Sequence, residues 1–315
     1  MKGGLNDETG FFGYSHLTAG FAGGQAEYVR VPYGDFNLLH LPDDVPDEKG
    51  LYLSDTLCTS WHCVVDTGVQ RNDVVAIWGA GSIGQMSAEF SLYHGAQRVI
   101  LIDGGEASWR LDFVRSKTPR IEPLDFSKLP KGETVKSELW RMVPGGPDVC
   151  LDCTSGEYAK SLTHRLETAV GMETDTSEML NEMITAVRPF GKVGVTGVYA
   201  GYVRILSVFH FGNLFVADCP QTNHFNVGAF MQLGIRFIAN GQCPVHKYWD
   251  HLLDLVRKGE INPFDMVTHR FRLDDMEKVY DLFSRRQLGM QKVFIQTKNS
   301  APPSHGAPSL TDLQM

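Results

Sequence analysis

The middle of the chain alternates short apolar runs with segments of helical periodicity. Runs rich in β-branched and aliphatic side chains are typical of buried strands, whereas apolar residues at three- and four-residue spacing predict amphipathic helices. Alternation of this kind predicts an α/β fold, with a doubly wound parallel sheet covered by helices on both faces. We expect strands over 74–78, 98–103, 148–152, 192–198 and 235–240, and helices over 85–95, 177–187 and 247–259.

The two ends of the chain follow a different pattern. Residues 23–32 alternate apolar and polar side chains, as in an antiparallel strand with one solvated face. A helix over 273–286 and a strand over 290–297 follow the α/β segment. The pattern therefore predicts a second unit, built from both ends and interrupted by the α/β domain. Residues 297–315 predict a disordered tail, because this Pro-, Ser- and Gly-rich stretch buries too little apolar surface to offset the entropy of ordering.

A glycine-rich turn connects the first expected strand of the α/β segment to its helix. It matches the pattern G-x-G-x-x-G and consists of Gly79, Ala80, Gly81, Ser82, Ile83 and Gly84. The pattern alone is weak, but its position after a strand and before a helix is the one that dinucleotide binding requires. The first glycine makes the tight turn, the second lets a pyrophosphate approach the backbone, and the third lets helix and strand pack closely. The alternative interpretation is an ordinary glycine turn.

Two charged residues extend this hypothesis. Asp103 ends the next strand, where a carboxylate can accept hydrogen bonds from both hydroxyls of an adenosine ribose. It would repel a 2′-phosphate and so favours NAD over NADP. Arg110 lies near the start of the following helix and is a candidate to cover the adenine, or an ordinary surface charge.

Composition excludes several classes of partner. A net charge of −8 argues against nonspecific binding to nucleic acid or to an anionic membrane surface. No apolar run approaches a membrane span, and the first residues lack the apolar core of a signal peptide. Six cysteines in a chain of this length do not make a disulfide scaffold, so we expect reduced thiols and a cytoplasmic location.

Several long stretches together resemble one family. They are FGYSHLTAGFAGGQAEYVRVP (12–32), LSDTLCTSWHCV (53–64), the glycine turn, AVRPFGKVGVTGVYAG (186–201) and THRFRLDDMEKVYDLF (268–283). Their order and spacing resemble the zinc-dependent medium-chain alcohol dehydrogenases. Within that family they are most similar to the branch of glutathione-independent formaldehyde dehydrogenases and formaldehyde dismutases.

The resemblance implies a domain organisation and a chemistry. It implies a partial GroES-like catalytic domain over 1–57, a Rossmann domain over 58–243, and the C-terminal part of the catalytic domain over 244–296. Its cofactors would be NAD and zinc, and the reaction would transfer a hydride between NAD and a small alcohol or aldehyde. The resemblance also implies a possible homo-oligomer.

Further site residues follow only from the resemblance. The stretch containing Gly197 and Val198 is similar to the family's turn at the nicotinamide, although Thr196 replaces its usual proline. Gln242 lies in a stretch similar to another turn near the cofactor, and Thr154 has a matching position. The alternative is that each of these residues only shapes a local turn and does not contact a cofactor.

The zinc site is the part of the pattern that this sequence does not complete. Asp55 falls where the branch places an aspartate ligand, although it could also cap the following helix. The family's other two ligands, a cysteine and a histidine in a G-H-E stretch, are absent, which we expect from a truncation before Met1. Cys58 and His62 would share a helical face with Asp55, but we interpret both as packing residues.

Three hypotheses therefore remain for the chain. It is part of a complete enzyme whose gene model is truncated, a noncatalytic remnant that binds NAD, or a protein that uses NAD without zinc. No residue of the sequence is assigned as catalytic.

Overall fold

The computed structural model describes residues 12–13, 20–154, 177–197, 199, 203–208, 214–219 and 224–313. The chain divides into two compact units, Tyr52–Leu252 and the pair of segments Met1–Leu51 and Leu253–Met315. The boundaries therefore differ from the expected 57/58 and 243/244. The helix α3 (Thr56–Thr67) lies wholly within the central unit, because its buried face packs against strands of that unit.

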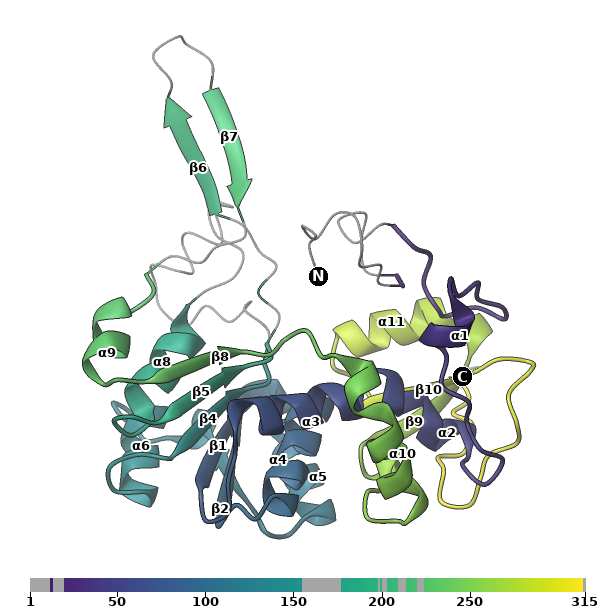
Figure 1. The fold of residues 1–315 in the computed structure, drawn as a ribbon, viewed down its shortest axis with the longest axis horizontal. Helices are drawn as coiled ribbons and strands as arrows, with labels where there is room; N and C mark the ends of the chain where they lie inside the picture. Colours follow the sequence, from purple (N-terminus) through teal and green to yellow (C-terminus); the bar gives the residue numbers. More distant parts are fainter. Residues whose placement is uncertain are drawn as a thin grey trace. The chain divides into compact units, whose positions relative to one another are not determined.

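The central unit contains a six-stranded parallel sheet in the order β3-β2-β1-β4-β5-β8 (Figure 1). This order confirms the expected doubly wound Rossmann arrangement. The order reverses between β1 and β4, and ligands of such sheets bind beyond the carboxyl ends of the strands at this point. The strands are β1 (Val74–Trp78), β2 (Arg98–Asp103), β3 (Ile121–Asp125), β4 (Val149–Asp152), β5 (Lys192–Val195) and β8 (Arg236–Ala239).

Strand β3 is the one strand of this sheet that the hydrophobic pattern does not predict. Its sequence, IEPLD, contains Pro123 and two acids. It pairs only with β2, at the edge of the sheet, where a proline costs no ladder hydrogen bond on the open side. An edge strand is buried less than a central one, so the apolar run that reveals the other strands is missing.

Helices cover both faces of the sheet (Figure 1). Along β1 and β2 the side chains alternate between faces, and Ala76, Trp78, Ile100 and Ile102 join one buried cluster with residues of α6 and α8. The opposite face lies beneath α3 and α4. The helices of this unit are α3, α4 (Ser82–Tyr93), α5 (Trp109–Lys117), α6 (Val135–Met142), α8 (Glu178–Ala186) and α9 (Val227–Gln232). An antiparallel pair, β6 (Val203–Val208) and β7 (Leu214–Cys219), completes it.

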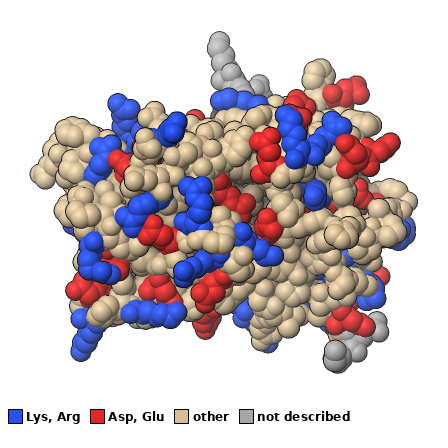
Figure 2. All heavy atoms as spheres, turned by 90° about the horizontal axis from the view of Figure 1, so that it is seen from below, with Lys and Arg blue, Asp and Glu red and all other residues tan. Residues whose placement is uncertain are grey.

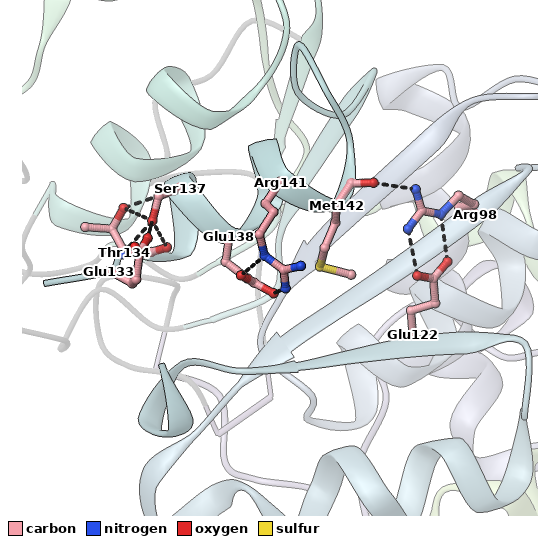
Figure 3. Close-up of polar contacts among 8 residues, drawn as sticks. All are labelled: Arg98, Glu122, Glu133, Thr134, Ser137, Glu138, Arg141 and Met142. Atoms are coloured by element: carbon pink, nitrogen blue, oxygen red, sulfur yellow. Dashed lines mark hydrogen bonds and ion pairs between the residues drawn. The ribbon is translucent and has the colours of Figure 1, made fainter. Parts of the chain in front are cut away.

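A charge pair joins the amino ends of β2 and β3 (Figure 3). Arg98 at the start of β2 donates two hydrogen bonds of 2.8 Å to Glu122 on β3 and a third, of 2.9 Å, to the carbonyl of Met142. Thr134 and Ser137 form a capping box that begins α6. Arg98 lies at the amino end of β2, remote from the glycine turn, and its contacts join β2 to β3 and to the end of α6.

The terminal segments form a smaller unit around a two-stranded parallel sheet. It contains α1 (Gly34–Asn37), α2 (Asp47–Gly50), β9 (Val267–Arg272), α11 (Met276–Ser284) and β10 (Lys292–Gln296), and α10 (Trp249–Arg257) crosses the boundary between the units. Residues 23–32, expected as an antiparallel strand, join no sheet among the described residues. A strand needs a partner, and alternation in the sequence does not supply one.

The C-terminal segment corrects the expectation of a disordered tail for its described residues. Ala301 accepts a hydrogen bond of 2.9 Å from the guanidinium of Arg270, and the amide of Thr311 donates to the carbonyl of Arg270 at 2.7 Å. Leu310 forms a parallel bridge with the same residue. Specific hydrogen bonds to a buried arginine thus order a segment whose composition alone does not favour order.

Candidate functional site

The glycine turn joins β1 to α4 at the carboxyl edge of the sheet. Gly79 has a φ of +92°, and its amide donates to the carbonyl of Ile102 at 2.8 Å. A Cβ on Gly84 would overlap the carbonyl oxygen of Gly79, so this glycine allows the helix to lie against the turn. A Cβ on Gly81 would meet nothing within 4 Å. The space beside Gly81 is therefore open, as a bound pyrophosphate would require.

The first turn of α4 supplies hydrogen-bond donors beside that space. Gly81 is the N-cap, and the amide of Gln85 donates to its carbonyl at 2.8 Å. The first amides of a helix have no acceptor within it, and the helix dipole places partial positive charge there. Ser82 and Ile83 are half-buried and lie in this turn. The arrangement can bind an anionic group such as a diphosphate.

Asp103 lies at the end of β2 and is only 7% exposed. Its Oδ2 accepts from the amide of Ala80 and its Oδ1 from the amide of Gly104, both at 2.8 Å. The sequence predicts a ribose contact for this carboxylate, and the structure shows that it accepts hydrogen bonds from the glycine turn. Arg110, the second residue of α5, has its guanidinium 5.8 Å from the ring centroid of its neighbour Trp109.

A second group of polar residues follows β4 and β5. The amide and hydroxyl of Thr154 donate to Oδ1 of Asp152 at 3.0 and 2.6 Å, and the hydroxyl of Tyr199 donates to Oδ2 at 2.9 Å. Asp152 is fully buried, and burial raises its pKa. The amide of Gly197 donates to the carbonyl of Asp152 at 3.0 Å. Thr154 and Gly197 therefore lie together, around an aspartate that the sequence shows only as a strand end.

The carboxyl ends of β5 and β8 are joined by another polar contact. The hydroxyl of Thr196 donates to the side-chain oxygen of Asn240 at 2.6 Å, and the Asn240 amide donates to the hydroxyl of Thr67 at 2.8 Å. Gln242 follows in an exposed bend. Val198 lies outside the described residues. Neither Asp152, the last residue of β4, nor Asn240, which follows β8, was singled out in the sequence. A polar residue at the end of an apolar run is the signal that could have found both.

The residues of the expected zinc site do not come together as a metal centre. Asp55 is exposed at the N-cap of α3, where its Oδ1 accepts from the hydroxyl of Thr59 at 3.0 Å and caps no backbone amide. Cys58 donates to the carbonyl of Leu53, and His62 Nδ1 lies 2.9 Å from the hydroxyl of Tyr248. Within the described part of the chain, no three His, Cys, Asp or Glu residues are placed to hold a metal ion. These residues alone do not fit zinc.

Charges of both signs are mixed on the surface in view. Figure 2 shows Lys and Arg interspersed with Asp and Glu on one face, without a large patch of either sign there. In the described ranges, every helix is too short or too polar to cross a bilayer.

Several curated proteins are similar to this chain in sequence. A zinc-type alcohol dehydrogenase-like protein of Schizosaccharomyces pombe is 33% identical over 285 residues, which are 90% of this chain and 61% of the relative. An uncharacterized zinc-type alcohol dehydrogenase-like protein of Bacillus subtilis is 31% identical over 294 residues, covering 92% of this chain and 71% of the relative. The chain thus spans less than two thirds of the yeast relative's length. No model of a protein family matches the chain.

The remaining comparisons agree. A glutathione-independent formaldehyde dehydrogenase of Pseudomonas aeruginosa is 30% identical over 304 residues, 91% of this chain and 67% of the relative. The solved structure of an alcohol dehydrogenase from Thermus sp. ATN1 superposes with a TM-score of 0.70 at 25% identity, over 92% of this chain and 71% of that one. With the Rossmann sheet and its glycine turn, these likenesses show that the chain belongs to the zinc-type alcohol dehydrogenase family.

Proposed function

We propose that this chain binds NAD at the glycine turn, as part of an oxidoreductase that transfers a hydride between NAD and a small alcohol or aldehyde. The observation that carries the proposal is the open space at Gly81 beside the first amides of α4. A diphosphate placed there accepts hydrogen bonds from main-chain amides and lies at the positive end of the helix. The nucleotide would then extend across the carboxyl edge of the sheet.

The preference for NAD rests on Asp103. Its carboxylate oxygens already accept from two amides, but each oxygen has a second lone pair that can accept a ribose hydroxyl. A 2′-phosphate would bring negative charge against a carboxylate that is 7% exposed. At the other end of the nucleotide, we assign contacts with the nicotinamide to Thr154, Gly197, Val198 and Gln242, and a contact with the adenine to Arg110.

Family membership carries an expectation of zinc, which would polarise the oxygen of an alcohol or aldehyde when bound. Asp55 is the residue of this chain that we assign to a zinc ligand, and it is exposed and free of backbone capping. One carboxylate does not make a zinc site. Formaldehyde-type substrates are supported by the name of the Pseudomonas relative.

A second candidate function is binding of NAD without catalysis. The absence of a three-residue metal cluster from the described part of the chain favours it for this polypeptide taken alone. A cytoplasmic location suits both functions, because the five cysteines whose side chains are described are free thiols. We propose a homo-oligomer only because the family that the chain resembles is usually oligomeric.

The test is a calorimetric titration of the purified chain with NAD and with NADP, combined with metal analysis. We expect heat with NAD and a weaker signal with NADP. Absence of heat with both nucleotides on folded protein would remove the proposal. Stoichiometric zinc with NAD-dependent oxidation of an alcohol would reject the noncatalytic candidate, whereas NAD binding without metal would support it.

A further inference from the structure

Two cysteines that are far apart in the sequence lie against each other in the central unit. Cys58 is in the first turn of α3 and is fully buried. Its thiol donates to the carbonyl of Leu53 at 2.9 Å and lies 3.8 Å from the carbonyl of Val245, two residues beyond Cys243. The thiol of Cys243 is an immediate neighbour of the Cys58 thiol and raises its pKa. The start of a helix and the turn after β8 thus meet through two sulfur atoms.

The two thiols differ in access to solvent. Cys243 is half-buried in an irregular segment next to the exposed Gln242, so small solutes can reach it. Cys58 is shielded, and the neighbouring thiol of Cys243 together with burial raises its pKa. A solvent-reachable thiol with a buried neighbour is the arrangement in which one cysteine reacts first and the other resolves the product.

We propose that Cys58 and Cys243 are a site of reversible oxidation by peroxides that closes an intramolecular disulfide. The Cys243 thiolate attacks one oxygen of hydrogen peroxide, the O–O bond breaks, and the released hydroxide takes up a proton to leave as water. Sulfur of Cys58 then displaces hydroxide from the sulfenic acid of Cys243, and this hydroxide combines with the Cys58 proton to form a second water. Two thiols lose two electrons in total, and one peroxide gains them.

The other described cysteines provide contrast within the same chain. Cys150 is fully buried on β4, where burial raises its pKa well above the ordinary value. Cys63 and Cys153 are a second pair of neighbouring thiols, in which Cys63 is fully buried and Cys153 contacts the hydroxyl of Ser87 at 3.7 Å. Cys243 belongs instead to an irregular turn whose backbone can shift as a disulfide forms. The disulfide would fix that turn to the start of α3.

The experiment treats the purified chain with hydrogen peroxide and counts free thiols after denaturation. The count should fall from six to four, and a reducing dithiol should restore it. Peptide mapping by mass spectrometry should find a single cross-link between the peptides of Cys58 and Cys243. These readouts require neither bound nucleotide nor activity, so they are independent of the proposed function.

Variants decide which thiols react. In Cys243→Ser the cross-link and the fall in thiol count should disappear, whereas in Cys150→Ser the loss of two thiols should persist. Circular dichroism establishes that each variant is folded, and if Cys58→Ser is unfolded, the half-buried Cys243→Ser still gives the answer. Retention of all six thiols in the wild type, a cross-link between Cys63 and Cys153, or a disulfide only between two molecules would each overturn the proposal.

Discussion

The carboxylate of Asp103 accepts a hydrogen bond from the backbone amide of Ala80 at 2.8 Å, joining the end of β2 to the middle of the glycine turn. The same carboxylate accepts from the amide of Gly104 through its other oxygen. The acid that we propose to set nucleotide specificity therefore also shapes the glycine turn. Replacing it changes two properties at once, and an experiment must separate them.

We expect Asp103→Ala to bind NAD more weakly relative to NADP and to lose about 1–3 kcal/mol of stability, because two buried amides lose their acceptor. Calorimetry with both nucleotides gives the first quantity and thermal unfolding gives the second. Asp103→Asn is the comparison, since its single acceptor can satisfy only one of the two amides. A variant that is destabilised but has unchanged nucleotide selectivity would leave Asp103 a purely structural role.

Substitutions at two glycines of the turn, Gly81 and Gly84, distinguish effects on NAD affinity from effects on stability. Gly81→Ala should leave stability within about 0.5 kcal/mol, because its Cβ meets nothing within 4 Å and its φ of −68° suits any residue. Its NAD affinity should fall roughly tenfold, or about 1.4 kcal/mol, because the methyl group occupies space assigned to the diphosphate. Undiminished NAD affinity in this variant would place the nucleotide elsewhere.

Gly84→Ala is the matched substitution in the same turn. Its Cβ would overlap the carbonyl oxygen of Gly79, so we expect the free energy of unfolding of the nucleotide-free protein to fall by about 1–3 kcal/mol. Thermal unfolding of the two variants side by side measures the difference. Equal stabilities would contradict the close packing of α4 on the turn.

The sequence predicts the sheet better than it predicts the terminal unit, for a physical reason. A buried strand such as 74–78 is revealed by its own side chains, and the structure confirms it as β1. Whether residues 23–32 pair as a strand and whether residues 301–313 are ordered depend on partners far away in the chain. Local composition does not identify those partners. The same holds for Asp103: its position predicts a ribose contact, but only coordinates reveal its bond to Ala80.

A buried ion pair dominates the terminal unit. The guanidinium of Arg270, 1% exposed, lies 2.5 Å from the carboxylate of Glu48, 3% exposed. Because removal of one partner leaves a buried charge uncompensated, we expect Glu48→Gln to cost about 3–5 kcal/mol. All five tryptophans lie in the central unit, so tryptophan fluorescence would not report on the terminal unit. The measurement is therefore unfolding in urea, monitored by hydrogen exchange of peptides from β9.

The control for this pair is a surface ion pair in the same unit. Arg257 and Asp44 are 46% and 58% exposed and lie 2.8 Å apart. Arg257→Ala should change stability by no more than about 1 kcal/mol, because solvent screens exposed charges. Similar losses in Arg257→Ala and Glu48→Gln would show that burial of the Arg270 pair contributes little.

The C-terminal segment should stabilise the same arginine. A chain ending at Asn299 lacks the carbonyl of Ala301 and the amide of Thr311, both bonded to Arg270. We expect faster hydrogen exchange across 267–272 and a loss of about 1–3 kcal/mol of stability, because the buried guanidinium and the carbonyl of Arg270 each lose a hydrogen-bond partner. Unchanged exchange in the shortened chain would mean that the tail is not held on β9.

Asp152 should make stability depend on pH in the opposite direction from a salt-bridged acid. Burial raises its pKa, although hydrogen bonds from Thr154 and Tyr199 partly offset this effect. The folded state therefore holds the proton more tightly than the unfolded state does. Its contribution to stability is complete below the ordinary pKa of about 4, and it decreases as pH rises until the folded-state pKa is passed.

Asp152→Asn removes this titration while keeping the shape of the side chain. Its oxygen can accept from Thr154, and its amide can donate to the hydroxyl of Tyr199. The melting temperature of the variant, measured relative to the wild type, should therefore increase as pH rises from about 4 towards neutrality. Asp112→Asn, at an exposed position on α5, controls for the loss of one negative charge. A difference between Asp152→Asn and the wild type that stays constant with pH would show that burial does not hold the proton on Asp152.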